Sequence, residues 1–168
     1  LVDLLAHELV HIAQWRAFPQ HEPRTSDERA AISSLIEGDA LLTAELVSER
    51  AGFGTPWRIK PPSSKIEDPH SFIKLFPYMY GRTFVSYLKN VGGWDLVNSA
   101  YYDPPRTQEQ VMHPEKYLEK EDPIKVSSPI PAGSEVLISD RAGEAFVLAF
   151  LGVHAPLADS KRGAEGWG

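Results

Sequence analysis

The 168-residue sequence contains no cysteine, and this absence excludes disulfide bonds and metal sites built from thiolate ligands. Long hydrophobic runs are also missing: the longest, 145–153, is about half of the roughly 18 residues that a membrane-spanning helix needs. Positive charge is scarce too, with 17 lysines and arginines against 23 aspartates and glutamates, a net charge of −6. Since nucleic-acid-binding proteins normally carry a basic patch, this composition argues against that class.

The length of the chain is sufficient for one domain with a sizeable core, and we expect residues 1–168 to form a single domain. The first residue is leucine rather than methionine, and it already belongs to a helical apolar pattern. The last residues, 163–168, carry no signal that ends an element. We therefore expect a fragment or processed product of a longer chain, in which any leader or anchor would lie upstream.

Helical periodicity dominates the sequence and predicts helices over 1–17, 25–50, 72–91, 94–101 and 145–153. Thr25 and Glu28 have the spacing of a capping box at the start of the second helix. Gly92 and Gly93 are expected to stop the third, and Asp140 to cap the last.

Weaker signals at 123–127 and 135–139 predict two short strands. The fold class that follows is mainly α (α+β), with minor β content.

The first predicted helix carries the sequence His-Glu-Leu-Val-His at residues 7–11, which matches the H-E-x-x-H pattern. On a helix, His7 and His11 lie one above the other on the same face, so both imidazoles can reach one ion. Glu8 is rotated by about 100° from His7 and flanks the ion without binding it. There it can accept a proton from water as that water attacks a carbonyl group.

The neighbours of the motif, 4–6, 9–10 and 12–13, are all apolar, so we expect this helix to be largely buried. Two buried histidines and a buried glutamate would need partners, and a metal ion supplies one for the histidines. The alternative is a solvated helix face that carries the three residues by chance.

A catalytic zinc ion requires three protein ligands, and Glu37 is the first candidate for the third. It is the only charged residue on a stripe of small and apolar residues along the second helix, where a lone carboxylate is costly unless it is paired. Gly38 in the middle of a helix is expected to allow close approach of the helix that carries His7. The other candidates are Glu45, Glu22 and His21.

This pair of motifs, HELVH followed by Ile36-Glu37-Gly38-Asp39-Ala40 on a second helix, resembles the gluzincin metallopeptidases, which include thermolysin and the zinc aminopeptidases. The resemblance implies that Glu37 is the third ligand and that one zinc ion binds per chain. The longer metzincin pattern is absent, because positions 14 and 17 are Gln and Ala.

The sequence departs from the thermolysin pattern at the partner of the zinc-bound histidine. Thermolysin-like proteins place an aspartate four residues after the ligand glutamate, and here that residue is Leu41. Asp39 points away from Glu37 on an ideal helix, and Asp3 is the other candidate partner. The chain also resembles a bacterial family with HELVH and EGDA segments, a Tyr-x-Tyr-Gly helix and a Gly-Gly-Trp turn.

Gluzincins also need a donor for the oxyanion of the tetrahedral intermediate, usually a histidine or a tyrosine. His113 is the first candidate, because it follows a polar run and precedes a proline, where the helix must end. Tyr117, Tyr80 and Tyr101 are the alternatives. The alternative is that these residues have only structural roles, with His113 in a turn and the tyrosines in the core.

The resemblance implies a zincin-like catalytic domain that works as a zinc-dependent metallopeptidase on a peptide or protein substrate. Zinc-activated water would attack the peptide bond, with Glu8 as general base and then as proton donor to the leaving amine. The main alternative is a catalytically inactive zinc-binding or regulatory module. A non-peptidase hydrolase or a structural zinc protein is a third possibility. The lack of cysteine and the export of many such peptidases favour an extracytoplasmic location.

Overall fold

The computed structural model describes residues 2–53, 58–125 and 129–167 of the chain. These residues form seven helices: α1 (Val2–Ala17), α2 (Ser26–Arg50), α3 (Pro69–Ala100), α4 (Gln108–Met112), α5 (Pro114–Leu118), α6 (Glu144–His154) and α7 (Leu157–Ala164). The prediction of a mainly helical protein is confirmed. The predicted β content is wrong for the described part of the chain, which contains no strand.

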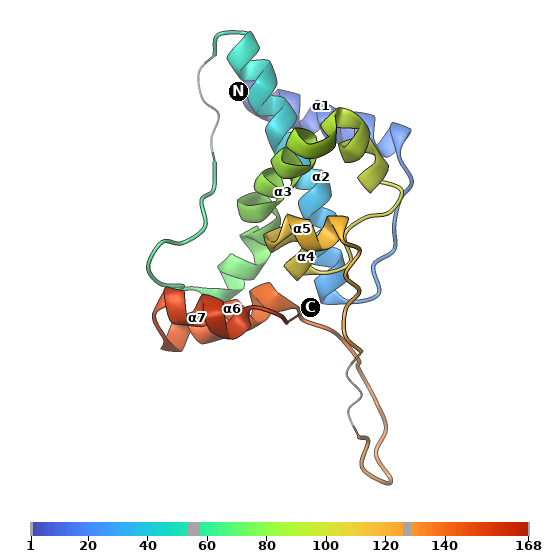
Figure 1. The fold of residues 1–168 in the computed structure, drawn as a ribbon, viewed down its shortest axis with the longest axis vertical. Helices are drawn as coiled ribbons and strands as arrows, with labels where there is room; N and C mark the ends of the chain where they lie inside the picture. Colours follow the sequence, from blue (N-terminus) through green and yellow to red (C-terminus); the bar gives the residue numbers. More distant parts are fainter. Residues whose placement is uncertain (1, 54–57, 126–128, 168) are drawn as a thin grey trace.

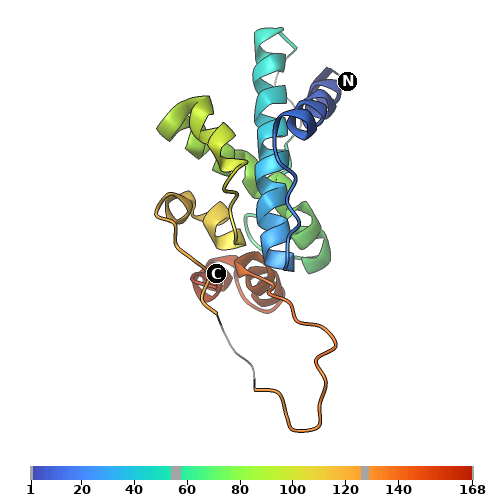
Figure 2. The ribbon, with the colours of Figure 1, turned by 90° about the vertical axis from the view of Figure 1, so that its right-hand side faces the viewer.

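The two long helices α2 and α3 form the centre of the molecule (Figure 1) and make the most extensive helix contact in it. Helix α1 packs against the middle and C-terminal half of α2, where it contacts Ile36 and Ser48, whereas α6 and α7 pack at the opposite end of the α2–α3 pair (Figure 2). The core is where α3 meets α2, α5 and α6, and its largest fully buried side chains include Phe76, Phe84, Leu35, Leu88 and Leu148. No described helix is both long and apolar enough to cross a lipid bilayer.

Two glycines allow α2 and α3 to approach closely. A Cβ atom on Gly38 would lie 2.2 Å from the carbonyl oxygen of Gly81, and one on Gly81 would lie 2.2 Å from the carbonyl oxygen of Ser34. Gly38 therefore does have a packing role, but the helix that it admits is α3 and not α1. This contact lies next to Glu37 and one turn from Tyr78, so it sets how near those two side chains come.

The break predicted at Gly92 and Gly93 is present inside α3. Gly92 has φ −135° and ψ 15°, and Gly93 has φ 67° and ψ −165°, so the helix is interrupted there and resumes as a last segment that ends at Ala100. The positive φ of Gly93 is one that glycine adopts without strain. The helix also starts earlier than the predicted 72, because Asp68 caps it and Pro69 occupies its first turn.

The start of α2 uses the predicted cap with one change. Thr25 accepts a hydrogen bond from the backbone N–H of Glu28 at 3.1 Å, as expected. The Glu28 carboxylate accepts from the N–H of Arg24 rather than that of Thr25. Asp140, predicted to cap the last helix, instead accepts from the backbone N–H and the hydroxyl of Ser26. It therefore joins the residues that precede α6 to the first turn of α2, where the helix dipole favours a negative charge.

The segment predicted as a strand at 135–139 is an irregular loop that extends away from the helices (Figure 2). Its apolar side chains are among the most exposed of the chain, with Leu137 at 85% and Ile138 at 86%. Alternating β-branched residues indicate a strand only when a neighbouring strand pairs with them, and no described segment does so. Of the other predicted strand, 123–125 has no regular structure, and the remaining residues, 126 and 127, lie outside the described residues.

Helix α1 is much more exposed than its composition suggests. Its only buried residue is Gln14, whereas Leu4, Leu5 and Leu9 are 54–61% exposed and Trp15 is 71% exposed. The expectation of a largely buried helix is therefore wrong for the described chain. Helix α1 packs chiefly on α2 with one face, and that face carries both histidines.

Candidate metal centre

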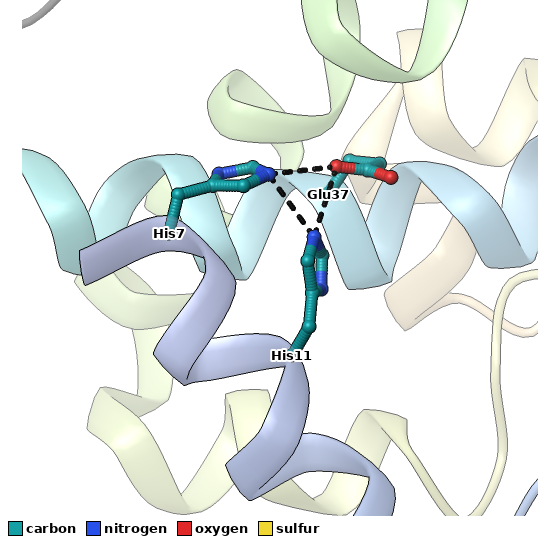
Figure 3. A group of neighbouring side chains, drawn as sticks. All are labelled: His7, His11 and Glu37. Carbon is teal, nitrogen blue, oxygen red and sulfur yellow. Dashed lines mark hydrogen bonds and ion pairs between the residues drawn. The ribbon is translucent and has the colours of Figure 1, made fainter. Parts of the chain in front are cut away.

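His7 and His11 stand one turn apart on α1 and point toward α2 (Figure 3). Their Nε2 atoms are 3.0 Å apart, and the two rings meet edge to face with centroids 4.6 Å apart. The i, i+4 spacing on one helix is sufficient to bring both nitrogens to the same point.

Glu37 reaches the same point from α2. Its Oε2 atom lies 3.2 Å from His7 Nε2 and 3.4 Å from His11 Nε2, so three potential ligand atoms form a small triangle (Figure 3). This is the one group of three or more such residues, within the described part of the chain, that could hold a metal ion. The three residues predicted as ligands are thus brought together.

The distances between the three ligand atoms fit a metal ion with tetrahedral coordination. With ligand distances of roughly 2.0–2.1 Å, two ligand atoms of a tetrahedral zinc site lie about 3.3–3.4 Å apart. The three observed separations are 3.0, 3.2 and 3.4 Å. Three lone-pair atoms can face one another at such distances only with a proton or a cation among them. The Oε2 atom of Glu37 is also one of two buried side-chain atoms in the described residues that make no hydrogen bond.

The charges at the cluster reinforce one another. The Glu37 carboxylate, which can accept a hydrogen bond from the protonated ring, raises the pKa of His11, although burial works against this and Gln14 adds to it. Burial alone would raise the pKa of Glu37, but the hydrogen bond and charge of His11, followed by Tyr78, lower it overall. The carboxylate is thus held in its charged, ligating form.

Glu8 is exposed beside the cluster and is not a member of it. Its charge is near enough to contribute to the pKa of His11, after the larger effects of Glu37, burial and Gln14. It also contributes, as the last of several causes, to the pKa of Tyr78. Glu8 is therefore a solvent-exposed carboxylate whose charge acts at the triangle.

Tyr78 on α3 is a site residue that the sequence analysis missed. Burial raises its pKa to about 12, and the charge and hydrogen bond of Glu37 act in the same direction. The three tyrosines considered from the sequence have other contacts: Tyr101 donates to Asp39, Tyr117 donates to the carbonyl oxygen of Asp103, and Tyr80 stacks on Phe76. No sequence pattern singles out Tyr78, because its proximity to Glu37 follows from the contact between α2 and α3 at Gly38 and Gly81.

His113, the predicted oxyanion donor, lies between α4 and α5 and contacts a different carboxylate. Its Nε2 atom is 3.0 Å from Oε1 of Glu144 on α6, and it does not belong to the triangle. The other candidates are also placed elsewhere: His21 Nε2 is 2.7 Å from the carbonyl oxygen of Tyr101, and Glu45 pairs with arginines. Glu22 is exposed, and Asp3 accepts a hydrogen bond from Ser48.

Comparison with known proteins assigns no family to the chain. No protein-family model matches it, and searches of curated proteins and of solved structures return no match.

A cleft of about 330 Å³ lies between α1, α2 and α3, and none of the three triangle residues lines it. Leu4 on α1, Leu41 on α2 and Tyr78 on α3 line it, and each lies within about one helical turn of a triangle residue or contacts one. Arg82 and Arg58 also line the cleft, and both pair with the buried carboxylate of Glu45. The cleft thus combines apolar side chains with charges of both signs, since Asp3 and Glu45 line it together with the two arginines.

Proposed function

We propose that this protein is a zinc-dependent metallopeptidase of the gluzincin type, with His7, His11 and Glu37 as ligands. The observation that carries the proposal is the triangle of two imidazole nitrogens and one carboxylate oxygen, 3.0–3.4 Å on each side, with Glu8 next to it on α1. Two nitrogens and one oxygen, with no thiolate, form the ligand set of many catalytic zinc sites. We propose a zincin-like fold together with this activity.

The metal site, Glu8 and the cleft would each have a separate role in catalysis. A bound zinc ion would supply Lewis-acid chemistry, polarising a carbonyl group and making water easier to deprotonate. Glu8 accepts the proton of the attacking water as its oxygen adds to the carbonyl carbon, and it then delivers that proton to the amine when the C–N bond breaks. The cleft beside Tyr78 would hold part of the peptide substrate next to the scissile bond.

A zinc-binding module without catalysis is the second candidate, and one observation favours it. Peptide substrates of gluzincins pair with the edge of a strand, and no strand is present in the residues that the structure describes. Such a module would retain the three metal ligands but would have no strand edge on which to align a peptide substrate.

Metal content tests the site itself. We expect about one zinc ion per chain by mass spectrometry after reconstitution, and a small fraction of that in Glu37→Ala. The matched control is Glu49→Ala, which makes the same change at an exposed position on the same helix. If the wild-type protein takes up no zinc, the proposal is wrong.

Peptidase activity then separates the two candidates. Cleavage of a denatured protein substrate should require zinc and should disappear in Glu8→Gln, which keeps the metal but lacks the base. Zinc uptake without any cleavage, by wild type and variant alike, would select the inactive module.

A further inference from the structure

Gln14 is the only buried residue of α1, with 6% of its surface exposed, and it lies one turn after His11. Its Oε1 atom is 2.9 Å from Nδ1 of His11. Its Nε2 atom is 3.0 Å from the carbonyl oxygen of Ile36 and 2.9 Å from Oδ2 of Asp39. A buried amide with all of these contacts has a defined orientation.

The contact with Ile36 decides that orientation. A backbone carbonyl oxygen can only accept, so the end of the Gln14 side chain that faces it must be the NH₂ group. The amide oxygen then faces His11, and an amide oxygen can only accept as well. His11 must therefore carry a proton on Nδ1, which leaves the lone pair of its neutral ring on Nε2, the atom that belongs to the triangle.

Asp39 holds the other end of the amide in place. Its Oδ2 atom accepts from Gln14 and, at 2.7 Å, from the hydroxyl of Tyr101, and its Oδ1 atom accepts from Thr43 at 3.3 Å. The ring of Tyr101 stacks on Phe18, just beyond α1, with centroids 4.0 Å apart. The chain of contacts from His11 to Tyr101 thus joins α1, α2 and the residue that directly follows α3.

We propose that Gln14, anchored by Ile36, Asp39 and Tyr101, fixes His11 in the tautomer that presents Nε2 to the metal. Gln14 is a positioning residue and touches neither metal nor substrate. It fills the role of the aspartate that the sequence lacks at position 41, through an amide on the histidine's own helix. The inference rests on the proposed metal site for its purpose, but the tautomer is a property of the metal-free protein.

The test replaces Gln14 with methionine, which keeps the length of the side chain and removes every hydrogen bond. Gln20→Met is the matched control, because it makes the same change at an exposed position whose amide contacts only the carbonyl oxygen of Phe18. Tyr101→Phe is a gentler variant that leaves Gln14 in place and removes one donor to Asp39. Circular dichroism establishes that each variant is folded.

Two measurements are made on each protein. Long-range ¹H–¹⁵N correlation spectra of the metal-free protein, at alkaline pH, show which nitrogen of His11 carries the proton. Competition with a chromophoric chelator gives the zinc affinity. We expect an Nδ1 proton in the wild type and in Gln20→Met, and an Nε2 proton in Gln14→Met. We expect zinc affinity to fall by roughly 10- to 100-fold in Gln14→Met and by less than tenfold in Tyr101→Phe.

The outcomes distinguish this inference from the proposed function. If the wild type binds zinc while Gln14→Met keeps both its affinity and an Nδ1 proton, the inference is wrong and the metal site stands. If the wild type binds no zinc, the proposed function is wrong, and the spectra of the metal-free proteins still decide the tautomer. An Nε2 proton on His11 in the metal-free wild type would overturn the inference by itself.

Discussion

Two regions of this molecule bring histidine and glutamate together, and they differ in how many groups converge. At the α1–α2 contact, two imidazole nitrogens face one carboxylate oxygen, and all three side chains are partly exposed, at 14%, 27% and 20%. Near α6, His113 alone faces Glu144, which is 2% exposed. In both places the Oε2 atom of the glutamate is buried without a hydrogen bond.

The difference between these regions lies in number and access rather than in residue type. A single protonated histidine beside a buried carboxylate forms an ion pair through one of the two carboxylate oxygens, and such a pair can serve a structural role. Where two histidines lie beside one carboxylate, the lone pairs of two nitrogens and one oxygen face one another, and a bound cation stabilises this arrangement. The partial exposure of the three side chains gives the cation access from solvent. We therefore expect changes in the first region to act on metal binding and changes in the second to act on folding.

The largest effect should separate the regions by zinc affinity. His7→Ala removes one of three ligands and should weaken zinc binding by at least about 3 kcal/mol, a factor of more than about 100. His113→Ala should leave zinc affinity unchanged, as should His70→Ala, an exposed control at the start of α3. Chelator competition measures all three. Equal zinc affinities of His7→Ala and His113→Ala would show that the two regions do not differ in metal binding.

The next effect is the reverse comparison, measured on stability. His113→Ala leaves the buried carboxylate of Glu144 without its partner and should lower the free energy of unfolding by about 3 kcal/mol. His7→Ala and His70→Ala should each change the metal-free protein by less than about 1 kcal/mol. Urea unfolding with a chelator present gives these values. A stable His113→Ala protein would show that the pair near α6 has no structural role.

A somewhat smaller effect should reach the metal centre without touching it. Gly38→Ala places a methyl group against the backbone of Gly81, so α2 and α3 must shift, at a cost of about 1–3 kcal/mol. Because Glu37 is the adjacent residue, zinc affinity should fall as well. Gly163→Ala is the control, since its Cβ would meet only the movable end of the Leu151 side chain. An unchanged zinc affinity in a destabilised Gly38→Ala protein would show that the triangle tolerates helix shifts.

The smallest effect is the pH dependence of stability that His113 contributes. The hydrogen bond with Glu144 raises the pKa of His113 above its usual 6.5, burial and Lys116 oppose this, and Glu115 adds to it. A raised pKa in the folded state means that the stabilisation is complete below pH 6.5 and is lost as the pH rises through the higher, folded-state value. Unfolding free energies of wild type and His113→Gln should therefore converge toward alkaline pH. Parallel curves would contradict the ion pair.

The parts of this fold that sequence alone predicts are those set by short-range patterns. The i, i+4 histidines, the cap at Thr25 and the break at Gly92 and Gly93 depend on residues within one or two turns of one another, and all are present. Glu37 was identifiable for a related reason, because a lone carboxylate on an apolar stripe needs a partner.

The parts that sequence could not supply depend on which faces meet. Helix α1 has an apolar composition, but periodicity says nothing of whether a neighbour covers that face, and it is largely exposed. Gly38 signalled a close approach without naming Gly81 as its partner. Gln14 and Asp39 each occupy ordinary helix positions, and only the crossing of α1 over α2 makes them a connected pair.

The exposed apolar surface of α1 has a consequence for local order. A helix that buries only one side chain has little buried apolar surface to lose, so we expect it to detach from α2 at a free energy well below that of global unfolding. An ion held by two side chains of α1 and one of α2 opposes that opening by about 2.7 kcal/mol when zinc is at 100 times its dissociation constant. Zinc supply would then set how much of the time this helix is docked, and amide hydrogen exchange in α1 would report the occupancy of the site.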